Sequence, residues 1–178
     1  MYSELTEKFI KTERVFSGSV LKLNVDTIEL PNGNQATREW VEHPGAVAVV
    51  PLCPNGKIAL VRQYRYPINA VTLELPAGKL DVEGESIEEC ARRELQEETG
   101  YIAGNIKHII SINTTPGFTN EVIHIYVAED LTRGEQSPDE DEFINVELYT
   151  PGEISHLIKN GEINDAKSLI GLLMAGVK

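Results

Sequence analysis

The sequence is poor in cysteine, and its two cysteines, Cys53 and Cys90, lie far apart without the CxxC spacing of zinc sites. This argues against a disulfide scaffold or a zinc fold and fits a reducing compartment, so we expect a cytoplasmic protein. Long apolar runs are also missing: Gly45–Leu52 falls far short of the roughly 20 residues that a membrane-spanning helix needs. Residues 1–12 lack the apolar core of a secretion signal. We therefore expect neither secretion nor a membrane partner.

Positive charge is scarce as well. The chain has 16 Lys and Arg against 28 Asp and Glu, which gives a formal net charge of −12. A protein that binds nucleic acid without sequence preference needs a basic face, so we expect no nucleic-acid partner. A solvated acidic surface accounts for most of these carboxylates. A few of them could instead be gathered to hold cations.

The 178 residues suffice for one hydrophobic core with a small appendage. Alternation of apolar and polar residues predicts strands, and helical spacing predicts helices. The predicted strands are 13–16 (the weakest), 21–26 with an extension towards 30, 35–42, 46–51, 57–64, 71–75, 106–113, 122–128 and 143–149; the predicted helices are 86–99, 151–160 and 165–175. Strands and helices interleave, which is typical of an α/β or α+β class. We expect residues 1–43 to form a small antiparallel sheet ahead of a main domain at 44–178.

The helix predicted at 86–99 has the clearest boundaries. Ser86 is a good N-cap, Glu89 three residues later completes a capping box, and Gly100 is a typical C-cap. An apolar stripe at helical spacing should face the core; its members are Ile87, Cys90, Ala91 and Leu95.

Three glutamates share one face near the end of this helix: Glu94, Glu97 and Glu98 lie at i, i+3 and i+4. Like charges at this spacing oppose each other, and the C-terminal end of a helix is unfavourable for anions. A divalent cation would reverse the sign of both effects, and carboxylate oxygens suit Mg²⁺ or Mn²⁺. The ordinary alternative for such a triplet is a solvated acidic face.

The surroundings of the triplet favour the cation. From Gly78 to Tyr101 the chain reads GKLDVEGESIEECARRELQEETGY. This resembles the Nudix box, G-x5-E-x7-R-E-U-x-E-E-x-G-U, in register from Glu85 onward. Two departures stand out: six residues instead of five separate Gly78 from Glu85, and Tyr101 occupies a position that is usually aliphatic. The extra residue falls in the loop 80–84, where an insertion costs little.

The resemblance implies a role for each residue of the box. Glu94 and Glu98 would be the principal metal ligands, with Glu97 in the same cluster and in catalysis. Arg93 would orient these carboxylates by ion pairing. The backbone before the helix would contribute too. The carbonyl of Ala77 would be a further metal ligand, and Gly78, which has no side chain, would allow a tight loop and a close approach of the backbone.

Segments outside the box resemble the ADP-ribose pyrophosphatases of this family. They are Arg38–Val47 (REWVEHPGAV), Arg62–Arg65 (RQYR), Leu73–Gly78 (LELPAG), Pro116–Glu121 (PGFTNE), with Pro116 sixteen residues after Gly100, and Asp139–Ile144 (DEDEFI). The last segment resembles an acidic loop that supplies a further glutamate. Glu142 is our first choice for the catalytic base or extra metal ligand, and Glu140 is the second. Composition alone would make residues 135–142 a solvated loop.

The same resemblance implies the substrate contacts Arg38, Trp40, Arg65, Pro116 and Gly117. Arg38 and Arg65 suit bidentate bonds to phosphate. Trp40, the sole tryptophan, would stack on adenine or pack in the core. In these enzymes the N-terminal sheet exchanges between subunits, so we expect a homodimer.

The expected fold is a Nudix α/β/α sandwich with a mixed sheet, plus the N-terminal antiparallel sheet. The expected reaction is Mg²⁺-dependent hydrolysis of ADP-ribose or a related ADP-sugar to AMP and a sugar phosphate such as ribose 5-phosphate, with Mn²⁺ able to substitute. Other small-molecule substrates remain alternatives: a GDP-sugar, a dinucleotide cofactor or an oxidised nucleotide. A non-catalytic nucleotide-binding sensor is a more distant alternative.

Overall fold

The computed structural model describes residues 2–140 and 142–177 and falls into two compact units. One unit contains the described residues up to Pro44 together with Asn113–Val122. The other contains Gly45–Ile112 and the described residues from Ile123 onward. The loop around Pro116 thus belongs with the N-terminal sheet, an association that the sequence pattern did not indicate.

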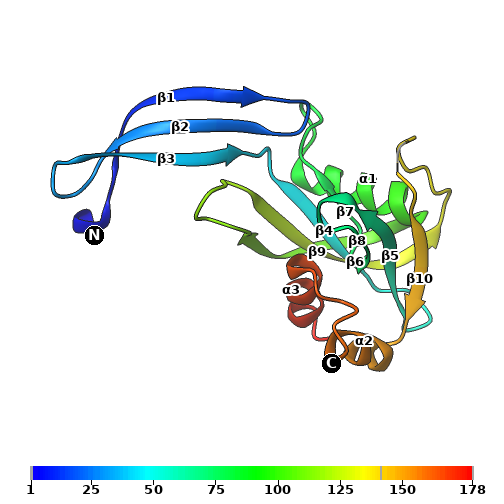
Figure 1. Cartoon of the computed structure of the whole chain (residues 1–178). Helices are drawn as coiled ribbons and strands as arrows, with labels where there is room; N and C mark the ends of the chain where they lie inside the picture. The colour runs from blue at the N-terminus through cyan, green and yellow to red at the C-terminus, as the bar shows by residue number, and fades with distance from the viewer. Residues whose placement is uncertain (1, 141, 178) are drawn as a thin grey trace. The chain divides into compact units, whose positions relative to one another are not determined.

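The first unit is built on an antiparallel sheet in the order β1-β2-β3 (Figure 1). Its strands are β1 (Lys8–Ser17), β2 (Lys22–Glu29) and β3 (Gln35–Glu42), and a 3₁₀ turn, η1 (Ser3–Leu5), precedes them. β1 is much longer than the predicted 13–16. Its register shifts twice against β2 and its side chains are all exposed, so it lacks the alternation by which a half-buried strand is recognised.

The loop Asn113–Val122 joins this unit through the end of β3. Val41 forms a bridge with Thr119, and its N–H donates to the carbonyl of Phe118 at 2.8 Å. The N–H of His43 donates to the side chain of Asn120 at 2.8 Å. Backbone groups therefore tie the loop to the strand that carries Arg38 and Trp40.

The second unit contains two sheets. One has the order β10-β5-β6 and the other β7-β4-β9-β8. The strands are β4 (Ala46–Pro51), β5 (Ile58–Arg65), β6 (Ala70–Glu74), β7 (Ala77–Lys79), β8 (Tyr101–Asn113), β9 (Val122–Arg133) and β10 (Asn145–Tyr149). The helices are α1 (Ile87–Thr99), α2 (Pro151–Lys159) and α3 (Ala166–Met174), and η2 (Tyr66–Ile68) is a 3₁₀ turn. β4 runs antiparallel to β7 and parallel to β9, so the second sheet is mixed.

Strand β4 divides the core into two layers, and all six of its residues are buried. Val47 and Val49 pack with Cys90, Ala91 and Leu95 of α1. The alternate residues Ala46, Ala48 and Val50 pack with a cluster that contains Ile154 of α2 and Leu172 of α3. Because successive strand residues point to opposite faces, α1 covers one face of the sheet and α2 and α3 cover the other (Figure 1). The predicted α/β/α sandwich with a mixed sheet is confirmed.

Several predicted details are wrong. Ile87, expected in the core, is 37% exposed because it starts α1, one turn before the residues that pack on the sheet. Strand β10 begins at Asn145, since Phe143 is 86% exposed. β7 went unpredicted, because Pro76 and Gly78 interrupt any strand pattern there. Among the described residues, no helix is both long enough and apolar enough to cross a membrane.

Candidate active site

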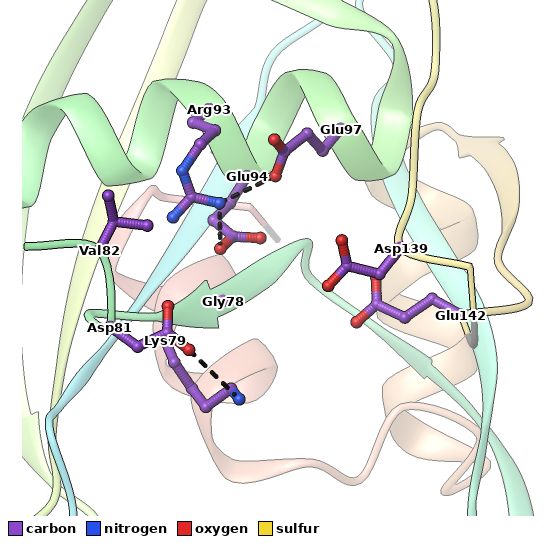
Figure 2. A pocket seen from close by; sticks show the side chains of 9 residues that line it. All are labelled: Gly78, Lys79, Asp81, Val82, Arg93, Glu94, Glu97, Asp139 and Glu142. Carbon is purple, nitrogen blue, oxygen red and sulfur yellow. Dashed lines mark hydrogen bonds and ion pairs between the residues drawn. The ribbon is translucent and has the colours of Figure 1, made fainter. Parts of the chain in front are cut away.

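A pocket of about 450 Å³ opens between α1, β7 and the acidic loop that precedes β10 (Figure 2). Its lining consists of Gly78, Lys79, Asp81, Val82, Arg93, Glu94, Glu97, Asp139 and Glu142. Five of these residues are acidic and two are basic, so the lining is strongly anionic. The pocket gathers residues from three stretches of sequence, and each of those stretches carries predicted site residues.

Local sequence sets which face of α1 meets this pocket. The hydroxyl of Ser86 accepts from the N–H of Glu89 at 3.2 Å, and the Glu89 carboxylate accepts from the N–H of Ser86 at 2.8 Å. At the other end Gly100 adopts φ 70°, a left-handed conformation that glycine reaches without strain. Between these caps Cys90, Ala91 and Leu95 dock on the sheet, and the adjacent face presents Glu94 and Glu97 to the pocket.

Arg93 ties three carboxylates together. Its Nε and Nη2 donate to the two oxygens of Glu85 at 2.8 and 3.0 Å. Its Nη1 donates to Glu94 at 2.7 Å and to Glu97 at 2.8 Å. The hydrogen bonds to Glu85 are the largest cause of the raised pKa of Arg93. This geometry suits the orienting role that the sequence implied for Arg93.

Gly78 allows β7 to approach α1 closely. A Cβ atom built at this position would lie 1.8 Å from Cδ of Glu94 and 2.0 Å from its Oε1. Real Cβ atoms do not come so close to other heavy atoms, so any side chain here would displace the Glu94 carboxylate. The close packing of Glu94 against β7 therefore requires glycine at position 78.

We expect Gly78→Ala to lower the rate of catalysis at least about tenfold, because misplacing a metal ligand by about 1 Å is costly. The melting temperature should fall only slightly, since Glu94 can swing into the pocket. Steady-state kinetics and circular dichroism would measure the two effects. Gly152→Ala is a matched control, because a Cβ there meets nothing within 4 Å. Unchanged kinetics in Gly78→Ala would contradict the packing argument.

Glu98 points inward from α1, is only 3% exposed and is not part of the pocket lining. Its Oε2 accepts from the N–H of Ala77 at 3.0 Å. Burial raises the pKa of Glu98 to about 8; the Ala77 bond opposes the shift, and the neighbouring charges of Glu142 and Glu94 add to it. Burial also raises the pKa of Glu94, against the effect of Arg93. These carboxylates are thus crowded and desolvated, an environment in which ionised groups need a cation.

The acidic loop contributes Asp139 and Glu142 to the pocket lining, whereas Glu140 is not part of it. The N–H of Glu142 donates to the carbonyl of Asp139 at 2.9 Å, which folds the loop back on itself. Glu142 is also close enough to Glu94 and Glu98 to influence both electrostatically. Of the two glutamates proposed from the sequence, the geometry favours Glu142. The pocket also includes residues that were not singled out: Lys79, Asp81, Val82 and Asp139.

The donor set suits a hard divalent cation. Glu94, Glu97, Glu98 and Glu142 offer carboxylate oxygens from α1 and the acidic loop, the ligand type that Mg²⁺ and Mn²⁺ prefer. Among residues 2–140 and 142–177, no three acidic, histidine or cysteine side chains already stand in ligand geometry. The carboxylates of Glu94 and Glu97 turn to the Arg93 guanidinium instead. These residues would hold the ion once their carboxylates turn from their present partners towards it.

The predicted substrate contacts do not line this pocket. Arg38, Trp40, Pro116 and Gly117 belong to the first unit. Arg38 donates to Glu7 at 3.1 Å. Trp40 is half-buried, and its buried Nε1 has no hydrogen-bond partner among the described residues.

Arg65 lies in the second unit but outside the pocket lining. It donates from Nε and Nη2 to the two oxygens of Glu74 at 2.9 and 2.8 Å. In this structure its bidentate partner is therefore a carboxylate of the protein, and phosphate binding by Arg65 stays a prediction.

Comparisons with known proteins identify the family and the fold. The family profile described as the NUDIX domain matches residues 42–170. The methanol dehydrogenase activator of Bacillus methanolicus is 48% identical over 168 residues, which cover 93% of this chain and 90% of that protein. The ADP-ribose pyrophosphatase of Bacillus subtilis (strain 168) is 45% identical over 166 residues, covering 92% and 89%. A solved structure titled "Crystal structure of ADP compounds hydrolase" superposes with a TM-score of 0.85 at 24% identity, over 97% of this chain and 94% of that one.

Proposed function

This chain belongs to the Nudix family, and we propose that it hydrolyses the pyrophosphate bond of ADP-ribose or a related ADP-sugar to AMP and a sugar phosphate such as ribose 5-phosphate. The observation that carries this proposal is the pocket in which α1 and the acidic loop bring their carboxylates together. The similarity to an ADP-ribose pyrophosphatase over most of the chain supports the choice of substrate.

The residues of the pocket have distinct tasks in this reaction. A bound Mg²⁺ or Mn²⁺ supplies charge neutralisation of the diphosphate and a lowered pKa for the attacking water. The ion would be held by Glu94, Glu97, Glu98, Glu142 and the Ala77 carbonyl. Arg93 orients the carboxylates of Glu94 and Glu97 through its hydrogen bonds to them. We assign removal of the proton from the attacking water to Glu142, which lines the pocket from the acidic loop (Figure 2); a role only as a ligand of the ion is the alternative.

Substrate recognition is assigned to residues outside the pocket. Arg38 and Arg65 would bind phosphate, and Pro116 and Gly117 would shape the substrate loop. Trp40 would stack on adenine through the face of its indole ring.

We further propose that the protein acts as a cytoplasmic homodimer. The edge strand β1 exposes Phe9, Val15 and Phe16, which are 64%, 49% and 56% exposed, and a second copy would cover such apolar side chains. A light-scattering mass of one chain in dilute solution would contradict the dimer.

Incubation with ADP-ribose and Mg²⁺, followed by product chromatography, tests the function directly. We expect AMP and ribose 5-phosphate in equal amounts, and no turnover when EDTA removes the divalent ions. A GDP-sugar, a dinucleotide cofactor and an oxidised nucleotide in parallel reactions test the alternative substrates. Faster turnover of any of these would replace ADP-ribose as the substrate. ADP-ribose binding without AMP formation over hours would indicate a sensor, and full turnover in EDTA would exclude the role of the metal.

A further inference from the structure

The segment Glu74–Ala77 connects the two sheets of the second unit and carries the group that holds Glu98. The chain leaves β6 at Glu74 and enters β7 at Ala77. The carbonyl of Pro76 accepts from the N–H of Val49 at 2.9 Å, and the N–H of Ala77 donates to Oε2 of Glu98 at 3.0 Å. The direction of the Glu98 carboxylate therefore depends on where this segment lies.

Helix α3 binds one end of this segment through an ion pair. Nζ of Lys167, in the first turn of α3, donates to the carboxylate of Glu74 and, at 2.9 Å, to Asp165. The side chains of Lys167 and Glu74 are only 10% and 3% exposed. Asp165 caps the same helix, because its side chain accepts from the N–H of Ser168 at 3.0 Å. The amine of Lys167 is thus held between the helix cap and the end of β6.

The next residue of α3 binds the segment one position further along. Oγ of Ser168 accepts from the N–H of Leu75 at 2.8 Å, and both residues are fully buried. Gly171, one turn later, packs so closely on Leu75 that a Cβ atom there would lie 2.6 Å from its Cδ1. Consecutive contacts of α3 therefore fix the backbone just before the residue that bonds Glu98.

A second connection runs through side chains. Besides Lys167, the Glu74 carboxylate accepts from Arg65, and the charge of Arg65 acts on Glu98. Burial alone would raise the pKa of Glu74, but the hydrogen bonds from Arg65 and Lys167 lower it to about 2. Buried ion clusters of this kind add little net stability over an apolar cluster of equal volume. Their main contribution is to fix the direction of the groups that they join.

We propose that Lys167 and Ser168 are positioning residues for Glu98, through which α3 sets the affinity of the pocket for its divalent cation. The inference rests on the proposed function, since it assumes that Glu98 holds the metal. By this proposal α3 helps to orient a metal ligand on α1, although α3 and α1 cover opposite faces of the sheet. Neither residue belongs to the pocket lining, so we expect their effect to pass through Glu74–Ala77 and Arg65.

The test uses Lys167→Met and Ser168→Ala in the full chain. Removal of groups that orient metal ligands lowers metal affinity about 10- to 100-fold. We expect the Mg²⁺ concentration for half-maximal turnover of ADP-ribose to rise about tenfold in Lys167→Met and less in Ser168→Ala. At saturating Mg²⁺, kcat and the KM for ADP-ribose should stay within about threefold of wild type. The rise in melting temperature on adding Mg²⁺ without substrate should shift to the same higher concentrations.

Two controls separate positioning from stability. Ile154→Ala opens a cavity in α2 on the same side of the sheet and should lower the melting temperature without changing the Mg²⁺ requirement. Lys159→Met removes an exposed charge and should change neither. If the Lys167 and Ser168 variants lose stability as Ile154→Ala does and keep the wild-type Mg²⁺ requirement, the proposal is wrong. Should Lys167→Met fail to fold, Ser168→Ala alone decides.

The melting-temperature measurement needs no hydrolysis. A wild-type protein that binds Mg²⁺ but does not cleave ADP-ribose would overturn the proposed substrate and leave this test intact. Loss of the Mg²⁺-induced shift in the two α3 variants, with the shift retained in Ile154→Ala, would still support positioning by α3.

Discussion

Glu98→Gln should lower kcat at saturating Mg²⁺ by at least about 100-fold, equivalent to roughly 2.7 kcal/mol of transition-state stabilisation. Glutamine keeps the size of the side chain, and its carbonyl oxygen can still accept from the N–H of Ala77. The variant loses the charge that would bind the cation and replaces the second carboxylate oxygen by an amide NH2 group. Because burial raises the pKa of Glu98 to about 8, the metal-free wild type must either protonate this carboxyl group on folding or bury its charge, and both cost free energy. The metal-free variant should therefore melt at least as high as the metal-free wild type. Steady-state kinetics and thermal unfolding measure the two effects.

The matched control for this prediction is Glu88→Gln on the same helix. Glu88 forms an ion pair with Arg92 at 3.1 Å, and its side chain is 55% exposed, whereas Glu98 is buried. Its loss should leave kcat within about twofold of wild type, as expected for a surface pair. A kcat within a few-fold of wild type for Glu98→Gln would remove Glu98 from the metal site and with it the main argument for the mechanism.

The sequence was most informative where the signals are local. Ser86, Glu89 and Gly100 mark the ends of α1 by short-range hydrogen bonds, and the predicted helix agrees with the structure to within one residue. Helical geometry then determines that Glu94 and Glu97 share a face. The strand at Ala46–Pro51 was predicted in full, because six apolar residues between turn signals leave few alternatives.

Long-range arrangements were not accessible to the sequence in the same way. The pairing of Glu74 with Lys167 joins residues 93 positions apart, and nothing in the segment that contains Glu74 points to Lys167 as its partner. Strand β1 was predicted too short because its register shifts twice and its side chains are all exposed, so its sequence lacks a regular apolar–polar alternation. The acidic loop shows both outcomes: its composition resembles any solvated loop, the family resemblance nevertheless singled out Glu142, and the fold adds Asp139 to the pocket lining.

Glu142→Gln should reduce kcat by about 10²- to 10⁴-fold, the usual contribution of a general base. Glu140→Gln, two residues away in the same loop, should leave kcat within about twofold of wild type, because Glu140 does not line the pocket. The pair is closely matched in chemistry and exposure, so a difference between the variants reports position alone. Steady-state kinetics at saturating Mg²⁺ make the comparison.

The dependence on Mg²⁺ and pH separates the two roles open to Glu142. If it is the base, Glu142→Gln should keep the wild-type Mg²⁺ requirement, and its kcat should rise with pH as hydroxide replaces the missing proton acceptor. If it is mainly a metal ligand, half-maximal activity should need far more Mg²⁺ and pH should give no recovery. Equal losses in the Glu142 and Glu140 variants would mean that the loop acts by its general charge. In that case the placement of Glu142 beside Glu94 and Glu98 would have no catalytic significance.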